Sequence, residues 1–521
     1  MSSKNNPSFE QQLFKAADKL RKNIDAAEYK YVVLGLVFIK YISETFNELY
    51  EKLEADAYSD PEDRDEYLAE NVFFVPQVAR WSHIHNSAKL PSVGEIIDEA
   101  MEAIEKENKE LKNVLPKVYG KANLDKASLG QLIDLISNTE LQAENEKSKD
   151  LFGRVYEYFL GEFANAEGKK GGQFYTPKSI VKLMVEMIEP YKGRVYDPAC
   201  GSGGMFVQTA HFIEDHSKGK SVNEAITVYG TELKSNNAKL AKMNLAIHGI
   251  EGKIIEGNSF YTNPHNLTGK CDFVMANPPF NVTKVDAKNK FLAEDDRLPF
   301  GVPLTGKGTI SNGNYLFAQY FYSYLNETGR AGFVMASSAT DAGNAEKLIR
   351  QKLIETGHVE CIVSIGNNFF YTRSLPCHLW FFNKGKKAEN KNKILMIDAR
   401  NTYRKVTSTI NDFSEEQLEG LTALINAFRG DDLGVNADNT WFNEYFPEGA
   451  YQDVEGLCKV VEMDEIIEQD YSLTPGRYVG VSIAVDMDFD YKGRMTEIHS
   501  ELATLNEEAN KLMNQIQSVE L

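Results

Sequence analysis

The sequence predicts an α/β protein, in which a doubly wound, mostly parallel sheet follows an N-terminal helical domain and precedes a C-terminal helical tail. Three observations support this fold class. Apolar residues recur at helical spacing through the first third of the chain. From about residue 173 to residue 400, short β-rich segments alternate with helical windows, which indicates right-handed crossovers within a parallel sheet. The C-terminal end repeats apolar side chains at alternating steps of four and three.

Length and composition limit the class of protein. The chain has 521 residues, of which 42% are hydrophobic and 26% charged, so it is long enough for several packed units and is not a disordered, collagen-like or disulfide-scaffold chain. Its 57 Lys+Arg and 76 Asp+Glu give a formal charge of −19. Because such a chain repels phosphate, we expect weak binding to nucleic acid unless basic groups gather on one face or a partner supplies them.

Nothing in the sequence indicates export or membrane insertion. The apolar run at residues 31–39 is much shorter than the ~20 residues that span a bilayer. The first residues lack the basic and then apolar pattern of a secretory signal, so we expect a cytoplasmic protein. The five cysteines are widely spaced and form no CxxC pair, which favours reduced, buried thiols over a zinc cluster.

The pattern divides the chain into four segments. A helical domain is predicted over residues 1–165, with windows at 8–24, 29–53, 96–115, 129–141 and 151–163. Residues 165–172, rich in glycine and lysine, are predicted to form a flexible hinge. The sheet domain is predicted over residues 166–400, an extension without assigned elements over 401–490, and a C-terminal heptad helix over 491–521.

The β-rich segments predict seven strands: 194–199, 226–233, 252–258, 271–279, 330–337, 359–366 and 377–384. Only a short loop separates the last two, which predicts an antiparallel hairpin at one edge of the sheet.

The expected C-terminal helix carries a seam that consists of Ile498, Leu502, Leu505, Ala509, Leu512, Ile516 and Val519. A seam of this period favours docking to a partner helix, although packing against the chain's own domain is the alternative.

A glycine-rich turn lies between the first predicted strand and the helix after it. It reads Asp197-Pro-Ala-Cys-Gly-Ser-Gly-Gly-Met205. Glycines let the backbone approach a ligand and point amides at its polar groups, which suggests a nucleotide-like cofactor. The turn is neither GxGxxG nor GxxxxGK[ST], which argues against dinucleotide or triphosphate binding, and a tight turn with close helix packing is the structural alternative.

Two further features follow this turn. Glu232 ends the next predicted strand, where a carboxylate can accept hydrogen bonds from both hydroxyls of a ribose, although carboxylates at strand ends are commonly just solvated. Asn277-Pro278-Pro279-Phe280 follows a later strand as a rigid, extended turn. Its Asn277 amide oxygen and Pro278 carbonyl can accept charge that develops on an aromatic amino group, and Phe280 can stack on the base. A proline-stiffened loop with a core phenylalanine is the alternative.

The order of these motifs resembles the class I S-adenosylmethionine-dependent amino-methyltransferases that act on adenine in DNA, with their Rossmann-like methyltransferase sheet. The segment Gly172-Gln-Phe-Tyr-Thr-Pro-Lys178 matches the one that in this family precedes the glycine turn. With the helical domain and the total length, the whole chain resembles the modification subunit of type I restriction-modification systems.

The resemblance implies a role for each matching residue. Contacts to S-adenosylmethionine are expected from Gln173, Phe174, Tyr175, Thr176, Pro177, Lys178, Ser202, Gly203 and Gly204. It also implies that Asp197 organises the methionine end of the cofactor and that Glu232 holds its ribose. Asn258 stands where many relatives have an aspartate that holds the adenine amino group, so the charge of that contact is absent here. Asn277, Pro278, Pro279 and Phe280 correspond to the catalytic turn.

The implied reaction is direct methyl transfer to N6 of an adenine that has left the DNA duplex, and it needs no metal. Neither His83 and His85 nor the Cys377-His378 pair has nearby companions that would complete a zinc site. We find no basic, turn-rich block after residue 280 that would read a DNA sequence. The implied partners are therefore double-stranded DNA, a specificity subunit that carries target recognition, a second modification subunit and, in a complete system, a restriction (translocase and nuclease) subunit.

Three alternatives to this function remain. A self-contained adenine DNA methylase would read its target with its own residues. A protein-glutamine methylase uses a similar NPP turn, but it usually ends that turn with tyrosine and is much shorter. A non-catalytic scaffold would keep the methylase fold for assembly alone, and the intact Asn277-Pro-Pro-Phe280 turn speaks against it.

Overall fold

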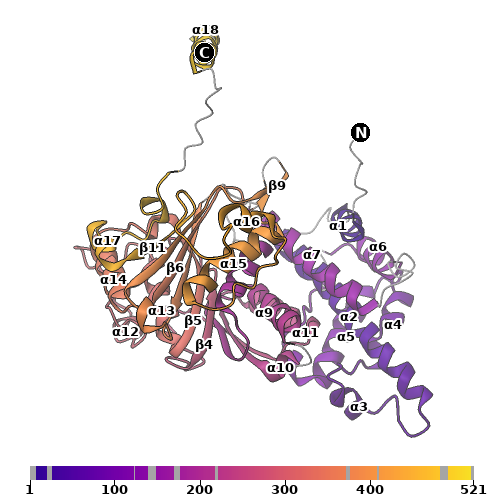
Figure 1. The fold of residues 1–521 in the computed structure, drawn as a ribbon. Helices are drawn as coiled ribbons and strands as arrows, with labels where there is room; N and C mark the ends of the chain where they lie inside the picture. Colours follow the sequence, from indigo (N-terminus) through magenta and orange to yellow (C-terminus); the bar gives the residue numbers. More distant parts are fainter. Residues whose placement is uncertain are drawn as a thin grey trace. The chain divides into compact units, whose positions relative to one another are not determined.

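The computed structural model describes residues 8–19, 26–121, 124–138, 148–168, 176–217, 221–370, 376–407, 410–481 and 491–517. Residues 1–479 belong to one compact unit and residues 480–521 to a second. The larger unit holds a helical region followed by a nine-stranded sheet, and the smaller one holds a single long helix (Figure 1). The predicted fold class is therefore confirmed.

The helical region is built around one apolar helix. Its helices are α1 (Phe9–Lys19), α2 (Ala26–Ala55), α3 (Arg64–Ala69), α4 (Trp81–Asn86), α5 (Val93–Glu107), α6 (Lys126–Ser137) and α7 (Ser148–Gly168). Residues 32–42 of α2 are buried on all sides, because α4, α6 and α7 pack around them. No helix in the described part of the chain is long and apolar enough to cross a membrane.

The structure departs from the prediction where we expected a flexible hinge at residues 165–172. Helix α7 continues through residues 165–168 to Gly168, so these residues are helical. The helix was not recognised this far because its last turn is polar and lacks the apolar spacing on which the prediction relied. Residues 169–172 lie outside the described residues.

The sheet has the strand order β11-β8-β6-β7-β5-β4-β1-β2-β3. Its strands are β1 (Gly193–Asp197), β2 (Ile226–Glu232), β3 (Gly252–Glu256), β4 (Cys271–Ala276), β5 (Leu325–Ala336), β6 (Val359–Ile365), β7 (Cys377–Asn383), β8 (Lys393–Ala399) and β11 (Cys458–Glu462). All seven predicted strands are present. Strands β7 and β11 run antiparallel to their neighbours, and the other pairings are parallel.

The hairpin prediction was half right. Strands β6 and β7 do pair antiparallel, with Val363 opposite Leu379. The hairpin does not form an edge, because β7 inserts between β5 and β6, and β8 and β11 continue the sheet beyond β6. Neither β8 nor β11 was among the predicted strands, so no strand was expected to pair with the outer side of β6. A two-stranded ribbon, β9 (Arg404–Thr407) with β10 (Ile410–Asp412), stands apart from this sheet.

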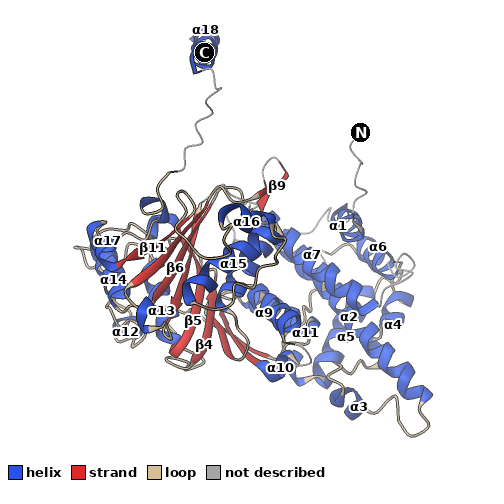
Figure 2. Cartoon of the chain, in the orientation of Figure 1, coloured by secondary structure: helices blue, strands red, loops and turns tan. Residues whose placement is uncertain are grey.

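Helices cover both faces of the sheet (Figure 2). One face packs against α8 (Lys178–Ile188), α9 (Gly204–His216), α11 (Ser235–Ile247) and α15 (Glu415–Arg429), and the other against α13 (Asn314–Tyr324) and α14 (Asn344–Glu355). Short helices complete the unit: α10 (Val222–Ala225), α12 (Lys290–Ala293), α16 (Thr440–Tyr445) and α17 (Met463–Glu468). Strand β7 is apolar on both faces, since Leu379 and Phe381 enter one core and Trp380 and Phe382 the other. The five cysteines are free and buried, as predicted.

Helix α11 belongs to two cores at once. Ala238, Ala241 and Leu245 pack in the sheet core, whereas Leu240 and Met243 pack in the core of the helical region. The Tyr41 hydroxyl on α2 donates a hydrogen bond to the Ile247 carbonyl at 2.6 Å. The helical region is thus fixed directly to the sheet domain through this helix.

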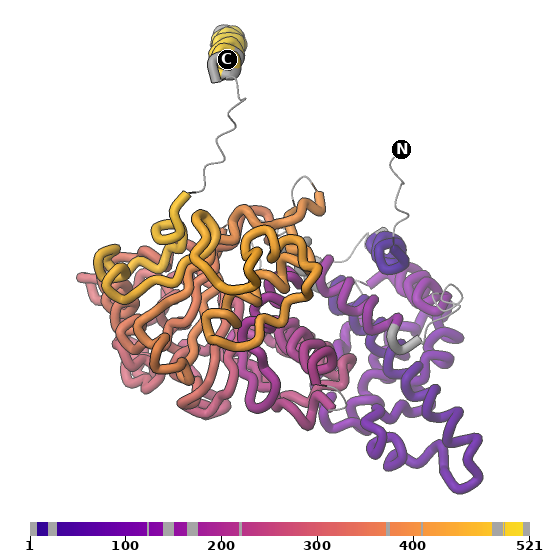
Figure 3. The backbone as a smooth tube through the Cα atoms, viewed as in Figure 1, coloured from indigo at the N-terminus to yellow at the C-terminus, as the bar shows by residue number. Residues whose placement is uncertain are grey.

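Helix α15 packs against α8, although the two helices are far apart in the sequence (Figure 3). A buried ion pair attaches α15 to the sheet. Arg429, the last residue of α15, donates to both carboxylate oxygens of Glu360 on β6, at 3.1 and 2.7 Å. The Asn383 amide on β7 donates to the same carboxylate at 2.7 Å. Burial alone would raise the pKa of Glu360, but the Arg429 charge and these hydrogen bonds outweigh it and lower the pKa.

The substitution Glu360→Gln should destabilise the protein by about 1–3 kcal/mol at pH 7, because it leaves the buried Arg429 with only the Glu189 carboxylate, 3.3 Å away, as a counter-charge. Chemical denaturation measures this change. Since the pKa of Glu360 is lower in the folded state, the stabilisation is complete above the unfolded pKa near 4.3 and is lost as the pH falls further. The matched change Glu327→Gln, at an exposed glutamate, should alter stability by less than about 0.5 kcal/mol. Equal effects of the two changes would contradict the argument.

Candidate active site

The candidate site forms where the carboxyl ends of three neighbouring strands meet. Strand β1 ends at Asp197 and β2 at Glu232, and Asn277 follows the last residue of β4. Strand β1 pairs in parallel with both β2 and β4, so the three ends lie at the same edge of the sheet. From β1 the chain continues to β2 on one side, and β4 lies on the other side of β1, so the strand order reverses here. Open α/β sheets bind ligands where the strand order reverses in this way.

The glycine turn connects β1 to α9. Gly201 and Gly203 adopt φ values of 56° and 80°, a backbone conformation that other residues rarely adopt. A Cβ atom built at Gly201 or Gly204 would meet no atom within 4 Å, so this part of the turn faces open space. The Asn244 side chain on α11 donates to the Ser202 carbonyl at 2.9 Å and holds the turn from the other side.

Two buried carboxylates flank the turn. Glu232 is 2% exposed and accepts hydrogen bonds from the backbone amides of Gly201 at 3.0 Å and of Lys234 at 2.9 Å. Asp197 is 1% exposed and accepts one from the Ala199 amide at 2.8 Å. Burial raises the pKa of Asp197 well above its usual value, and the neighbouring Glu232 charge raises it further against the effect of the Ala199 hydrogen bond. This pocket therefore favours a cationic ligand.

Asn258 lies two residues beyond β3 and lines the larger cavity described below. Its side-chain oxygen accepts a hydrogen bond from the Phe260 amide at 3.0 Å, and its carbonyl accepts one from the Tyr261 amide at 2.8 Å. The residue is thus held in a tight turn. An amide oxygen has two lone pairs, so this one can accept a second hydrogen bond from an amino group.

The proline turn is anchored by a residue from the upstream motif. The Asn277 side-chain nitrogen donates to the Thr176 hydroxyl at 2.8 Å, which fixes the orientation of the amide. Pro278 is buried, Pro279 is exposed, and Phe280 is partly buried at the cavity wall. The structure therefore brings Thr176 and Asn277 together.

Two of the remaining upstream residues lie at the start of α8. Pro177 precedes α8, and Lys178 begins it, with its ammonium group 3.6 Å from the Glu157 carboxylate. Gln173, Phe174 and Tyr175 were predicted to contact a cofactor, and they lie outside the described residues.

Two cavities share the glycine turn and Asn277 as a wall. The larger, of about 640 Å³, is lined by Glu232, Asn258, Asn277, Pro278 and Phe280, together with Gly201 and Ser202. The smaller, of about 90 Å³, is lined by Thr176, Lys178, Asp197 and Gly204. The larger volume lies within the range of small-molecule and cofactor sites. All the described predicted site residues except Pro177 and Gly203 line one of these two cavities.

Sequence reasoning missed several residues of this site. Lys30 on α2 and Leu160 on α7 line the larger cavity, so the helical region supplies part of its wall. Asn281, directly after the proline turn, exchanges two hydrogen bonds of 2.9 Å with Asn314 at the start of α13. Asn281 also has a positive φ of 53°, so this pair stabilises an unusual backbone conformation next to Phe280. No local pattern marks these residues, because they meet only through tertiary packing.

Comparisons with known proteins agree with this geometry. Residues 147–486 match the N-6 DNA Methylase family, and residues 9–136 match the HsdM N-terminal domain. The type I restriction enzyme MjaIX methylase subunit of Methanocaldococcus jannaschii is 38% identical to this chain, and the match covers 98% of this chain and 91% of that protein. The HindI methylase subunit of Haemophilus influenzae is 36% identical, over 81% of this chain and 94% of that protein.

A solved structure supports the fold assignment. The type I restriction-modification methyltransferase subunit from Streptococcus thermophilus has a TM-score of 0.73 and 23% sequence identity, and the match covers 90% of this chain and 99% of that one. The relatives favour an adenine methylase over a protein-glutamine methylase or a silent scaffold. The chain therefore belongs to the methylase subunits of type I restriction enzymes, which are DNA methyltransferases that modify N6 of adenine.

Proposed function

We propose that this chain binds S-adenosylmethionine against the glycine turn and methylates adenine in double-stranded DNA, in the cytoplasm, as part of a larger complex. One observation carries the proposal: Asn277, whose amide is oriented by Thr176, shares a cavity with Glu232 and with the open side of the glycine turn. This arrangement supports the proposal, because the residues proposed as the catalytic acceptor and the ribose acceptor line one cavity together with the glycine turn.

The residues around the turn fit the proposed cofactor. When bound, S-adenosylmethionine supplies a methyl group activated by its positively charged sulfur. Glu232 would accept hydrogen bonds from the ribose hydroxyls, and Asn258 one from the adenine amino group. Asp197 would favour the positive charge of the methionine end, with Lys178 and residues 173–177 at its carboxylate. The buried Asp197 supports this assignment, because it has no cation of its own among its described partners.

The catalytic turn would act on the target base by orientation and by electrostatics. The Asn277 oxygen and the Pro278 carbonyl would accept hydrogen bonds from the adenine amino group and stabilise the positive charge that develops on it. Phe280 would stack on the extruded base and recover part of the lost stacking, about 1–3 kcal/mol. The methylated nitrogen would then lose a proton to water, which leaves the product amine neutral.

Target recognition would come from other chains. The net charge of −19 disfavours DNA binding by this chain alone, and the relatives are named as subunits of type I enzymes. Helix α18 (Tyr491–Gln517) offers a docking surface, because Leu502, Leu505 and Leu512 are 58%, 60% and 58% exposed. We assign this seam to a specificity subunit. A second modification subunit and a restriction subunit would complete the assembly.

Asn277→Ala should lower the rate of methyl transfer by about 100-fold or more, because it removes an acceptor that acts on the transition state. Cofactor affinity should change by less than about threefold. Transfer of radiolabelled methyl groups to duplex DNA, with the specificity subunit present, measures the first quantity, and calorimetry the second. Thr176→Val should give a smaller loss, and Asn86→Ala, at an exposed asparagine, none. An unchanged rate in Asn277→Ala would refute the proposed catalytic turn.

Asp197→Asn should weaken cofactor binding by at least about tenfold at pH 8 while leaving the ligand-free protein no less stable. The folded state raises the pKa of Asp197, so its carboxylate costs stability increasingly as the pH rises above the unfolded pKa near 3.9. In the unsubstituted protein, affinity should fall as the pH drops through the raised pKa, and Asp197→Asn should show no such fall. Asp296→Asn, at an exposed aspartate, serves as the control. Equal pH profiles for Asp197→Asn and the control would contradict this role.

The double change Leu502→Asp with Leu505→Asp should prevent assembly with the specificity subunit, because it places charges in the apolar seam. Size-exclusion chromatography of the mixed subunits measures assembly, and cofactor binding should remain unchanged. Ala503→Asp with Asn510→Asp, away from the seam on the same helix, provides a matched control that keeps assembly. If the seam variant assembles like the control, the docking surface lies elsewhere.

A further inference from the structure

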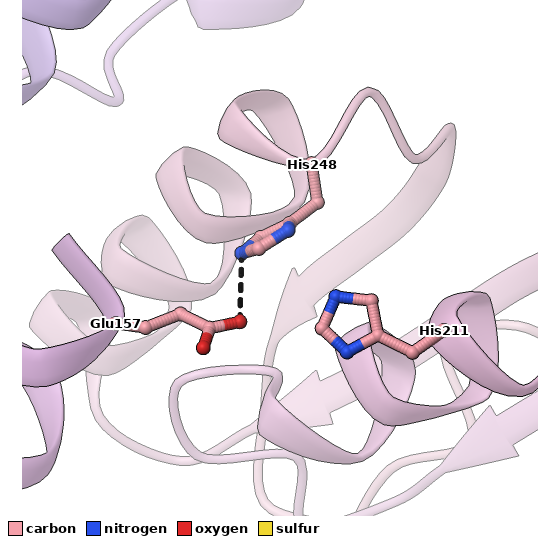
Figure 4. Close-up of side chains that lie close together, drawn as sticks. All are labelled: Glu157, His211 and His248. Carbon is pink, nitrogen blue, oxygen red and sulfur yellow. Dashed lines mark ion pairs between the residues drawn. The ribbon is translucent and has the colours of Figure 1, made fainter. Parts of the chain in front are cut away.

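Three side chains from separate elements lie close together near the glycine turn. Glu157 lies on α7 of the helical region, His211 on α9, and His248 directly after α11. One ligand-type atom from each residue lies within 4.8 Å of the other two. Figure 4 shows the carboxylate and the two imidazole rings facing a common space. In the part of the chain that the structure describes, no other group of histidine, cysteine and acidic residues meets this criterion.

The cluster lacks the hydrogen bonds that would satisfy it. His248 Nε2 lies 3.3 Å from Glu157 Oε1, yet both atoms are buried and neither makes a hydrogen bond within the described structure. The His211 and His248 rings stand edge to face with centroids 5.7 Å apart. Leaving buried polar atoms unpaired is costly, and a shared cation would satisfy them.

We propose that Glu157, His211 and His248 form a Zn²⁺ site that joins α7 of the helical region to α9 and α11, the two helices that hold the glycine turn. Two imidazoles and one carboxylate are a common ligand set for zinc, and they disfavour Mg²⁺, which prefers oxygen ligands. Bonds of about 2.1 Å in tetrahedral geometry place ligand atoms about 3.4 Å apart. The pair of Glu157 and His248 already has nearly this spacing at 3.3 Å, and a ring nitrogen of His211 lies within 4.8 Å of both ligand atoms.

The location gives the site a positioning role. Helix α9 follows the glycine turn directly, and α11 holds that turn through Asn244. Glu157 is also a wall residue of the smaller cavity, and its other oxygen lies 3.6 Å from the Lys178 ammonium. A metal bound to one carboxylate oxygen therefore leaves the second available to orient Lys178. This inference stands on the three side chains and does not require the proposed catalytic roles.

The test uses the untagged, full-length protein after removal of metals with a chelator. Titration with Zn²⁺ against a competing chelating dye should show one site per chain, and Zn²⁺ should raise the melting temperature. His211→Asn and Glu157→Gln should each weaken the affinity by at least about tenfold and reduce the rise in melting temperature. His83→Asn, at an exposed histidine, should leave both unchanged. Mg²⁺ at millimolar concentration should not compete.

A second measurement does not depend on any variant folding correctly. Co²⁺ added to the metal-free protein should give the visible absorption of a four- or five-coordinate site, and one equivalent of Zn²⁺ should abolish it. Circular dichroism checks that each variant is folded. The proposal fails if Zn²⁺ does not bind at one equivalent, if both variants bind it like His83→Asn, or if Mg²⁺ displaces it.

Discussion

The parallel pairing of β2, β1 and β4 is the constraint on which the rest of the site depends. In-register parallel strands end together, so their carboxyl ends present three consecutive loops at one edge of the sheet. These loops carry Glu232, the glycine turn and Asn277. Neither an acidic residue nor a proline turn is informative alone, and their common location is what relates them chemically. The helices that pack on the sheet then hold these loops in place.

The site also concentrates negative charge in a buried place. Asp197 and Glu232 are almost inaccessible to water. Their described hydrogen bonds come from backbone amides and, for Glu232, also from the Asn237 side chain at 3.5 Å. Amides orient a carboxylate without cancelling its charge. The ligand-free protein thus bears an electrostatic cost that a cationic ligand relieves. Under the proposed function, the carboxylates that cost stability would be the ones that bind the cofactor, which is common where a protein is preorganised for a charged partner.

The sequence was sufficient to predict the motifs that depend on local order, and insufficient for those that depend on packing. The seven strands and the glycine turn have clear local patterns, and the structure contains all of them. Strands β8 and β11 were missed, since one follows a lysine-rich segment closely and the other is a short strand in a weakly patterned region. Without these two strands, β6 and β7 were predicted to form an edge of the sheet. The cluster of Glu157, His211 and His248 was also not predicted, because its members meet only after α7 has packed on α9 and α11.

The helical region is more than an attachment to the catalytic sheet. Lys30 and Leu160 form part of the cavity wall, so the space in which the substrate base is expected is completed by residues from both regions. The same boundary holds the carboxylate and imidazole cluster. Changes in α2 or α7 therefore reach the site through direct contact.

Because α11 contributes opposite faces to two separate cores, its register cannot slip. An α-helix turns by about 100° per residue, so inserting or deleting a single amino acid would rotate both apolar faces out of their cores together. Most helices of this length border one core and can adjust by shifting toward solvent. This one has no such freedom, and evolution of the chain should tolerate changes in its length least of all.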